Sequence, residues 1–164
     1  MAEEGRGIRA LDAGDYRAAA ESFRKAVDLA PDSAALRHKL GTALSLAGDT
    51  PGAIGQFEEA LRRSPGFAQA HYSLGVLLAS SGRPSQALEQ LAAAVKSQPD
   101  YVDARLRLAE VLRQTGRMEQ SLTQYQAVLA IDPRVSDARF GYAATLAALG
   151  RLPEARDAFS EGAR

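Results

Sequence analysis

The sequence predicts an all-α protein in which one pair of antiparallel helices is repeated along the chain. Prolines recur every 34 residues, at Pro31, Pro65, Pro99 and Pro133. Glycines follow the same spacing, at Gly14, Gly48, Gly82, Gly116 and Gly150. A spacing that holds through the whole chain is typical of stacked copies of one helix-turn-helix unit. Each copy then buries its apolar side against its neighbours, so the core is a long seam.

The prolines divide the chain into five repeats that we treat as a single array over residues 1–164. The approximate bounds are 1–33, 34–67, 68–101, 102–135 and 136–164, the last repeat being truncated. In each repeat the glycine is expected to end the first helix, because a residue in the left-handed conformation lets the chain reverse tightly. The proline ends the second helix because it cannot continue one.

The first helix of each repeat carries an apolar stripe at helical spacing. One column of this stripe holds only small residues, namely Gly41, Gly75, Ala109 and Ala143. Glycine inside a helix costs roughly 1 kcal/mol relative to alanine. Its recurrence therefore indicates that a neighbouring helix approaches closely at this column.

The second helix of each repeat alternates small and large residues, as interdigitating helices require. The sets are Ala19, Phe23 and Ala26; Ala53, Phe57 and Ala60; Ala87, Leu91 and Ala94; Ser121, Tyr125 and Val128; Ala155 and Phe159. We expect the large members, such as Phe57 and Tyr125, to form the core between the helices.

These columns resemble the signature of the tetratricopeptide repeat (TPR) family, apart from its tryptophan and its first-helix tyrosine. The resemblance extends over almost the whole chain. It implies a right-handed superhelical solenoid of antiparallel helix pairs, with a concave groove lined mainly by first helices. The repeats differ from one another too freely for a strict consensus design.

The chain departs from the family pattern in two places. The column that holds tryptophan in the family has Arg37, His71, Arg105 and Arg139. We expect these side chains to cover apolar surface with their stems while their heads reach water; a basic ladder for an anionic partner is the alternative. The first repeat has polar or small residues, Glu3 and Arg6 among them, at apolar columns. Its first helix should therefore be frayed or act as a polar cap.

Composition excludes several classes of partner and chemistry. Twenty basic and twenty acidic residues cancel, which argues against nucleic acid or an anionic membrane as the main partner. The chain has no cysteine, which excludes disulfides, zinc-thiolate sites and thiol catalysis. The two histidines, His38 and His71, lie in different helical columns, so we expect no metal and no cofactor.

No catalytic motif is found in the sequence. It has no nucleophile turn, no phosphate-binding glycine loop and no zinc-binding histidine pair, so we expect no enzymatic activity. No segment approaches a membrane-spanning length, and the chain as given has no signal peptide. The cytoplasm is the compartment we favour, although these residues do not determine it.

The expected groove face begins one place after the tryptophan column and continues along the first helices. Its candidate ligand-binding residues are His38, Thr42, Tyr72, Val76, Leu106, Arg107, Glu110, Arg113, Phe140 and Ala144. Small side chains leave room for a ligand, and the larger apolar ones can anchor it. An extended peptide or a partner helix fits this face. The alternative is that the rings fill their own groove or cover neighbouring repeats.

Positive charge lies near the same face, at Lys39, Arg107 and Arg113. The spacing of Asp103 to Arg107 and of Glu110 to Arg113 is that of ordinary intrahelical ion pairs. Family members that bind chaperone tails hold a carboxylate with lysines, an arginine and asparagines at set first-helix places. This sequence has no asparagine, which disfavours that mode of binding.

The sequence therefore favours a noncatalytic scaffold that binds a peptide segment or helix of a partner protein. Two alternatives remain open. The chain could be the repeat portion of a larger enzyme, for example of glycosyltransferase type, that recruits substrates. It could also be a self-association element, because Ala155, Ala158 and Phe159 give the last helix an apolar flank with no capping helix after it. That flank suggests a fragment of a longer array or a contact between two copies.

Overall fold

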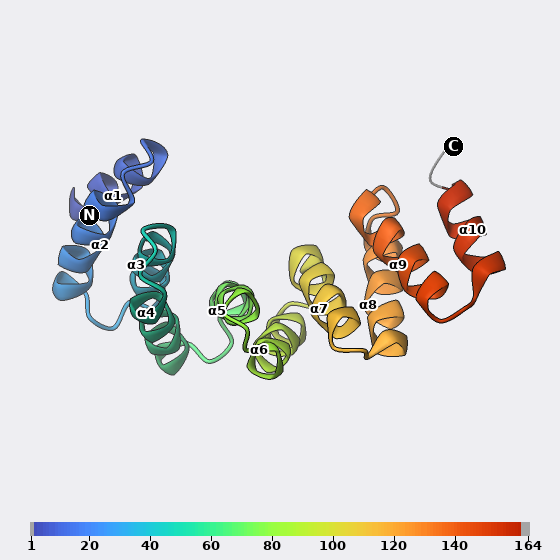
Figure 1. Cartoon of the computed structure of the whole chain (residues 1–164). Coiled ribbons are helices and arrows are strands. Elements are labelled where there is room, and N and C mark those ends of the chain that lie inside the picture. Colours follow the sequence, from blue (N-terminus) through green and yellow to red (C-terminus); the bar gives the residue numbers. More distant parts are fainter. Residues whose placement is uncertain (1, 162–164) are drawn as a thin grey trace. The chain divides into compact units, whose positions relative to one another are not determined.

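The computed structural model describes residues 2–161 and is entirely helical in this range apart from the connecting turns (Figure 1). Ten helices follow one another within these residues. They are α1 (Ala2–Asp12), α2 (Tyr16–Leu29), α3 (Ala34–Leu46), α4 (Thr50–Arg63), α5 (Ala68–Ser80), α6 (Pro84–Ser97), α7 (Val102–Gln114), α8 (Met118–Ile131), α9 (Ser136–Ala148) and α10 (Leu152–Glu161). Among the described residues, no helix has the length and apolar character needed to span a membrane.

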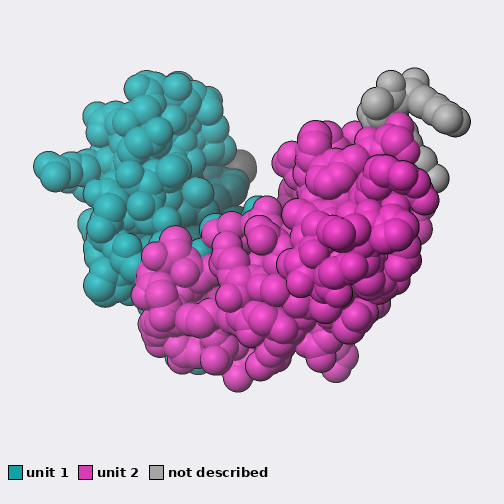
Figure 2. Space-filling model, turned by 45° about the vertical axis from the view of Figure 1, so that its right-hand side comes forward, with its two compact units in different colours: residues 1–77 teal, residues 78–164 magenta. Residues whose placement is uncertain are grey.

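Contacts divide the chain into two compact units, residues 1–77 (unit 1) and residues 78–164 (unit 2) (Figure 2). In unit 1, α2 packs against α1 and α3, and α3 packs against α4. In unit 2, each helix from α6 to α10 packs against the next, and α7 also contacts α9. Each unit is therefore built from neighbouring helices stacked in sequence order, as the repeat columns predict.

The turns within the helix pairs lie at the glycines that recur every 34 residues. The five glycines have positive φ angles: 75° at Gly14, 86° at Gly48, 72° at Gly82, 77° at Gly116 and 76° at Gly150. Only glycine adopts this left-handed conformation without strain from a side chain. The prediction that these residues end the first helices is confirmed.

Small residues on the first helices make room for rings on the second helices. A Cβ atom added to Gly41 would lie 2.7 Å from the ring of Phe57. Gly7, one repeat earlier in the same column, faces Phe23 in the same way, also at 2.7 Å. Phe23 and Phe57 are both buried. The close approach inferred from the repeated glycine is therefore a contact between a backbone and an aromatic ring.

The first helix was expected to be frayed or to act as a polar cap, and the structure shows it formed over Ala2–Asp12, against the first alternative. α1 is helical from Ala2, and Gly7 is buried against Phe23. The missing large apolar residues are not needed, because the ring from α2 covers the glycine backbone. Polar residues of α1 also take part in packing, since the Glu4 carboxylate lies 2.6 Å from the Lys39 ammonium on α3.

Tyr125 occupies the ring column of α8 and is buried with Ala109, Val128 and Ala138. Its longer side chain needs space that a phenylalanine does not. Gly141 on α9 supplies this space, because a Cβ atom at that position would overlap the phenol ring. Burial raises the pKa of Tyr125 above its ordinary value, so the phenol stays neutral.

The side chains of the tryptophan column make a hydrogen bond that the sequence did not predict. Each of its side chains bonds the carbonyl oxygen of the proline six residues earlier. The contacts are Arg37 Nε to Pro31 O at 3.0 Å, His71 Nε2 to Pro65 O at 2.9 Å, Arg105 Nε to Pro99 O at 2.7 Å, and Arg139 Nη2 to Pro133 O.

This contact ties the start of each first helix to the turn before it, and we call it the proline latch. Two arginines also reach the following second helix, where Arg37 Nη1 lies 3.5 Å from Gln56 Oε1 and Arg105 Nη1 lies 3.0 Å from Gln124 Oε1. These bonds to the proline carbonyls lie at exposed positions, so they add to the expected role of heads that reach water. One or two of the five N–H donors of each guanidinium are engaged in this way.

Candidate functional site

The candidate residues divide between the two compact units. Unit 1 holds His38 and Thr42 on α3 and Tyr72 and Val76 on α5. Unit 2 holds Leu106, Arg107, Glu110 and Arg113 on α7 and Phe140 and Ala144 on α9. We call the surface that these residues form within each unit the first-helix face of that unit.

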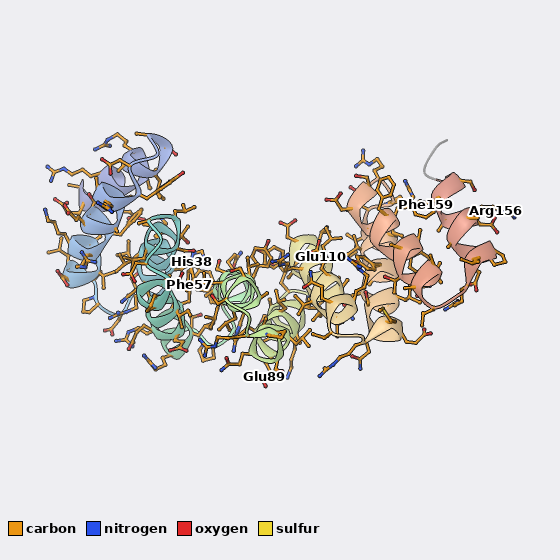
Figure 3. All side chains as sticks on the ribbon, viewed as in Figure 1. His38, Phe57, Glu89, Glu110, Arg156 and Phe159 are labelled. Atoms are coloured by element: carbon orange, nitrogen blue, oxygen red, sulfur yellow. The ribbon has the colours of Figure 1, made fainter. Side chains whose placement is uncertain are left out.

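In unit 1 the first-helix face is largely occupied by its own packing. The half-buried His38 ring has its centroid 5.5 Å from that of Phe57 and 5.2 Å from that of Phe67. Its Nε2 atom lies 3.0 Å from the Ser73 hydroxyl on α5. Figure 3 shows His38 and Phe57 close together on neighbouring helices. At this position the His38 ring packs α3, α4 and α5 together. This is the alternative in which a ring of the face covers neighbouring helices instead of a ligand.

The environment of His38 favours the neutral imidazole. Burial lowers the pKa of His38, a hydrogen bond with the Gln69 backbone works in the opposite direction, and the charge of Lys39 lowers it further. Burial disfavours the charged form of a histidine because the imidazolium loses its hydration. The ring is therefore a neutral hydrogen-bonding partner of Ser73 near pH 7.

Lys39 is not an available charge on this face. Its ammonium lies 2.6 Å from the Glu4 carboxylate on α1. That hydrogen bond also holds the pKa of the Glu4 carboxyl below its ordinary value. The pair bridges two first helices whose positions are 35 residues apart, and the intrahelical spacing rule could not have found it.

The charged residues of unit 2 pair differently from the expectation. Arg107 Nη1 lies 2.8 Å from Glu110 Oε2, so Glu110 pairs with the residue before it and not with Arg113. Arg113 instead lies near the buried Tyr125, where it opposes the rise in pKa that burial causes. Glu110 has an arginine three residues away on both sides, and the tertiary contact to Tyr125 decides between them.

The apolar part of the unit 2 face is open to solvent. Phe140 is 62% exposed, and its ring packs against that of Phe159 on α10, with centroids 5.9 Å apart. Ala144, one helical turn further along α9, is also exposed. Leu106 on α7 is half-buried and packs against the cluster around Tyr125. This face therefore combines one exposed ring with small and aliphatic side chains.

Three partners of the candidate residues were not anticipated. Phe67 and Ser73 cover His38, and Phe159 covers one side of Phe140. His38 and Phe140 belong to one repeat column, and Phe57 and Phe159 belong to another. The His38–Phe57 and Phe140–Phe159 pairs therefore occupy equivalent positions in their repeats. An alignment of the repeats with one another could have predicted the Phe140–Phe159 contact from the His38–Phe57 contact.

Residues 2–161 contain no group of three or more histidine, aspartate or glutamate side chains placed to hold a metal ion. The chemistry that the first-helix face offers is apolar contact, hydrogen bonding and ion pairing. These are the interactions of a binding surface.

The helix pairs turn at left-handed glycines and pack aromatic rings against small residues at repeating positions. These features define a helical-repeat protein. The sequence profile of the tetratricopeptide repeat family matches residues 5–65, 38–89, 72–134 and 119–164. These matches together span nearly the whole chain, and the protein belongs to the tetratricopeptide repeat family. No curated protein matches the sequence significantly.

Solved structures show the same fold. A crystal structure of MamA superposes with a TM-score of 0.89 at 22% identity, covering 95% of this chain and 91% of that one. MamA from Desulfovibrio magneticus RS-1 gives 0.88 at 19% identity, with 98% and 90% covered. YrrB, described as a TPR protein with an unusual peptide-binding site, gives 0.80 at 24% identity, with 95% and 80% covered. The all-α, TPR-like fold predicted from the repeat columns is confirmed.

Proposed function

We propose that this protein is a noncatalytic interaction scaffold that holds a peptide segment or a helix of another protein on its first-helix face. Family membership supports a binding role, and YrrB is a structurally similar protein with a peptide-binding site. The observation that carries the proposal is the exposure of Phe140 beside Ala144 in unit 2.

Phe140 has the properties of an anchor for a ligand. Burying a phenylalanine side chain fully contributes about 1.5–3 kcal/mol, and 62% of this residue is still exposed. About 1.4 kcal/mol corresponds to a tenfold change in affinity. Covering this one ring can therefore change the dissociation constant by about a factor of ten, which is the scale of an interface hot spot.

The rest of the unit 2 face suits a peptide of mixed composition. Ala144 leaves space next to the ring, while Arg107 and Glu110 form a polar pair on the neighbouring helix α7. An apolar centre with a polar border is the usual arrangement of a protein interface. Because these residues lie on formed helices, binding needs little ordering of the receptor.

The test uses peptides selected from a random phage-displayed library against the wild-type protein. Their dissociation constants are then measured for Phe140→Ser and for Leu152→Ser. Leu152 is a matched control, since it is 64% exposed but lies at the start of α10, outside the proposed face. We expect Phe140→Ser to weaken binding about tenfold and Leu152→Ser to leave it unchanged. Equal binding by wild type and Phe140→Ser would show that the peptides do not bind at the first-helix face of unit 2.

Self-association through α9 and α10 is a second candidate function. It is favoured by the Phe140–Phe159 pair, in which Phe159 is 44% exposed although its column is buried in the other repeats that the structure describes. Sedimentation velocity over a range of concentrations tests it. Self-association predicts a dimer that Phe159→Ser disrupts, whereas a monomer at all concentrations would reject it.

A further inference from the structure

Unit 2 contains a cavity that lies outside the first-helix face. This outer cleft has a volume of about 350 Å³ and lies between α6, α7 and α8. Its floor is formed by Leu88, Leu108 and Leu112. Its rim includes Arg117, Thr123 and Gln124. All of these residues belong to one compact unit.

The outer cleft and the first-helix face lie on different sides of α7. Leu108 and Leu112 are two residues before and after Glu110, and each residue turns an α-helix by about 100°. The leucines therefore point about 200° away from Glu110. Figure 3 shows Glu110 on one side of unit 2 and Glu89, the neighbour of Leu88 on α6, on the opposite side. A ligand in the cleft is thus independent of the function proposed above.

The floor of the cleft is aliphatic. Leu88, Leu108 and Leu112 are buried, while Ala92 on α6 is an exposed small residue at its edge. Cavities that hold small ligands span about 300 to 1,000 Å³, so this cleft is at the small end of that range. Its size suits one aliphatic side chain with the adjoining backbone, and not a whole helix.

The rim offers one hydrogen-bond acceptor and one donor, because the bonds that Thr123 and Gln124 already make within the protein leave these groups available. The Thr123 hydroxyl donates to the Glu119 carbonyl at 3.1 Å, which leaves the Thr123 oxygen as an acceptor. Gln124 Oε1 accepts from Arg105 at 3.0 Å, which leaves the Gln124 amide nitrogen as a donor. One acceptor and one donor side by side match the N–H and C=O groups of a peptide backbone.

Arg117 adds a positive charge to the rim. Arg83 and Arg151 occupy the same position as Arg117 in their own repeats, and each bonds the side chain three residues later. Arg83 donates to Gln86, and Arg151 donates to Glu154 through two bonds of 2.8 and 2.7 Å. In the part of the chain that the structure describes, the Arg117 guanidinium has no such bond. An arginine in this state favours a carboxylate, which it can bind through charge-assisted hydrogen bonds.

The equivalent cleft of unit 1 lacks this combination. It lies between α2, α3 and the start of α4, and Ala20, Arg24 and Asp49 occupy the places of Leu88, Ala92 and Arg117. Asp49 is itself engaged, because it caps α4 by accepting from the Gly52 amide at 3.0 Å. The unit 1 cleft has arginines of its own, Arg17 and Arg24, but it lacks the aliphatic wall, and the acidic Glu21 and Asp49 line it beside them.

We propose that the outer cleft of unit 2 binds an extended peptide segment in which an aliphatic residue adjoins an acidic one. The aliphatic side chain fills the floor over Leu108 and Leu112. The carboxylate pairs with Arg117, and the peptide backbone bonds Thr123 and Gln124. The cleft gives the protein a second interaction surface, separate from the first-helix face.

The experiment titrates ¹⁵N-labelled protein with a synthetic blocked hexapeptide, Ser-Ala-Glu-Leu-Ala-Ser, and follows the amide resonances. We expect saturable shifts at Leu112, Thr123 and their neighbours. Matched peptides carrying lysine for the glutamate, or serine for the leucine, should bind about tenfold more weakly or not at all. These two peptides test the charge and the aliphatic contact separately.

Three variants complete the test. Ala92→Arg fills the cleft and Arg117→Glu reverses its charge, and both should weaken binding of the hexapeptide about tenfold or more. Both residues are exposed, so circular dichroism should show an unchanged fold. Arg24→Ala, in the unit 1 cleft, is the control and should bind like wild type.

Absence of saturable shifts in the cleft would overturn the proposal, as would equal binding of the lysine peptide. Shifts confined to the residues around Phe140 would also overturn it, because they would place the peptide on the first-helix face. Conversely, Phe140→Ser should leave binding in the cleft intact. The two proposals can therefore fail independently.

Discussion

The α3–α4 pair of unit 1 and the α9–α10 pair of unit 2 carry the same contact between equivalent positions. In the first pair the His38 and Phe57 rings lie 5.5 Å apart with an interplanar angle of 42°. In the second pair the Phe140 and Phe159 rings lie 5.9 Å apart at 54°. The repeat thus builds one local geometry in two places.

The two pairs differ in what covers them. Phe57 is 2% exposed and Phe159 is 44% exposed. In unit 1, Phe67 and Ser73 close over His38 from the side of α5. Within residues 2–161, α9 is the helix against which α10 packs. A repeat column therefore determines which side chains meet, whereas the next helix determines whether they are buried or available to a partner.

The largest expected effect comes from truncating the two second-helix rings. Phe57→Ala should destabilise the protein by about 3–5 kcal/mol, because it leaves a cavity in a packed core. Phe159→Ala should cost less than about 1.5 kcal/mol, because much of the ring is already in contact with water. Chemical denaturation followed by circular dichroism measures both. Similar losses of stability for Phe57→Ala and Phe159→Ala would contradict the difference in burial between the two helix pairs.

The next effect concerns the glycine beneath the ring of Phe57. In Gly41→Ala the new methyl group would lie 2.7 Å from this ring. Overpacking costs about 1–3 kcal/mol, and alanine recovers roughly 1 kcal/mol of helix propensity, so we expect a net loss of stability. Gly55→Ala on α4 is the control, since nothing lies within 4 Å of its added Cβ. That variant should be stabilised, and a stabilised Gly41→Ala would contradict the close contact.

The proline latch gives a smaller difference between the two pairs. Arg37 bonds Pro31 and Gln56, whereas Arg139 bonds Pro133 and has an alanine, Ala158, at the glutamine position. A hydrogen bond contributes about 0.5–1.5 kcal/mol. We expect Arg37→Met to destabilise more than Arg139→Met, as measured by denaturation midpoints. Wild-type stability of both variants would show that the latch contributes nothing.

The smallest effect is a pH dependence that belongs to unit 1 alone. The folded protein lowers the pKa of His38 below its ordinary value of 6.5. The unfolded chain then takes up a proton at a higher pH than the folded chain does. The stabilising contribution is fully present above that value and is lost as the pH falls through the folded pKa.

Thermal melts of wild type and His38→Phe between pH 7.5 and 5 test this effect. The variant places a phenylalanine at the position that Phe140 holds in unit 2, and its stability should change less with pH. This range lies above the ordinary pKa of 4.5 for glutamate, and the pKa of Glu4 is lower still, so the Glu4 carboxylate stays charged throughout. An identical pH dependence in both proteins would assign it to other groups.

Much of the fold was predictable because its signals are local. A proline cannot continue a helix and a glycine can adopt a positive φ, whatever surrounds them. The alternation of small and large residues likewise indicated which side chains fill the core, and Phe23, Phe57 and Tyr125 are buried as expected. Phe159, in the same column, is not.

The candidate site was less predictable because its residues depend on neighbours that are distant in sequence. Arg107 and Arg113 are equally spaced from Glu110, and only the proximity of Tyr125 to Arg113 separates their roles. Likewise, nothing near His38 in the sequence indicates that Phe67 and Ser73 cover it. Spacing along one helix does not contain this information.

The sequence by itself determined the repeat, the helix ends and the side chains that face one another, since these follow from steric properties of each residue and from helical periodicity. Only the tertiary structure decided which of those side chains stay exposed, which charges pair, and where the outer cleft opens. The physical reason is that burial and ion pairing depend on the helix packed alongside. Equivalent columns therefore carry a packed histidine in unit 1 and an open phenylalanine in unit 2.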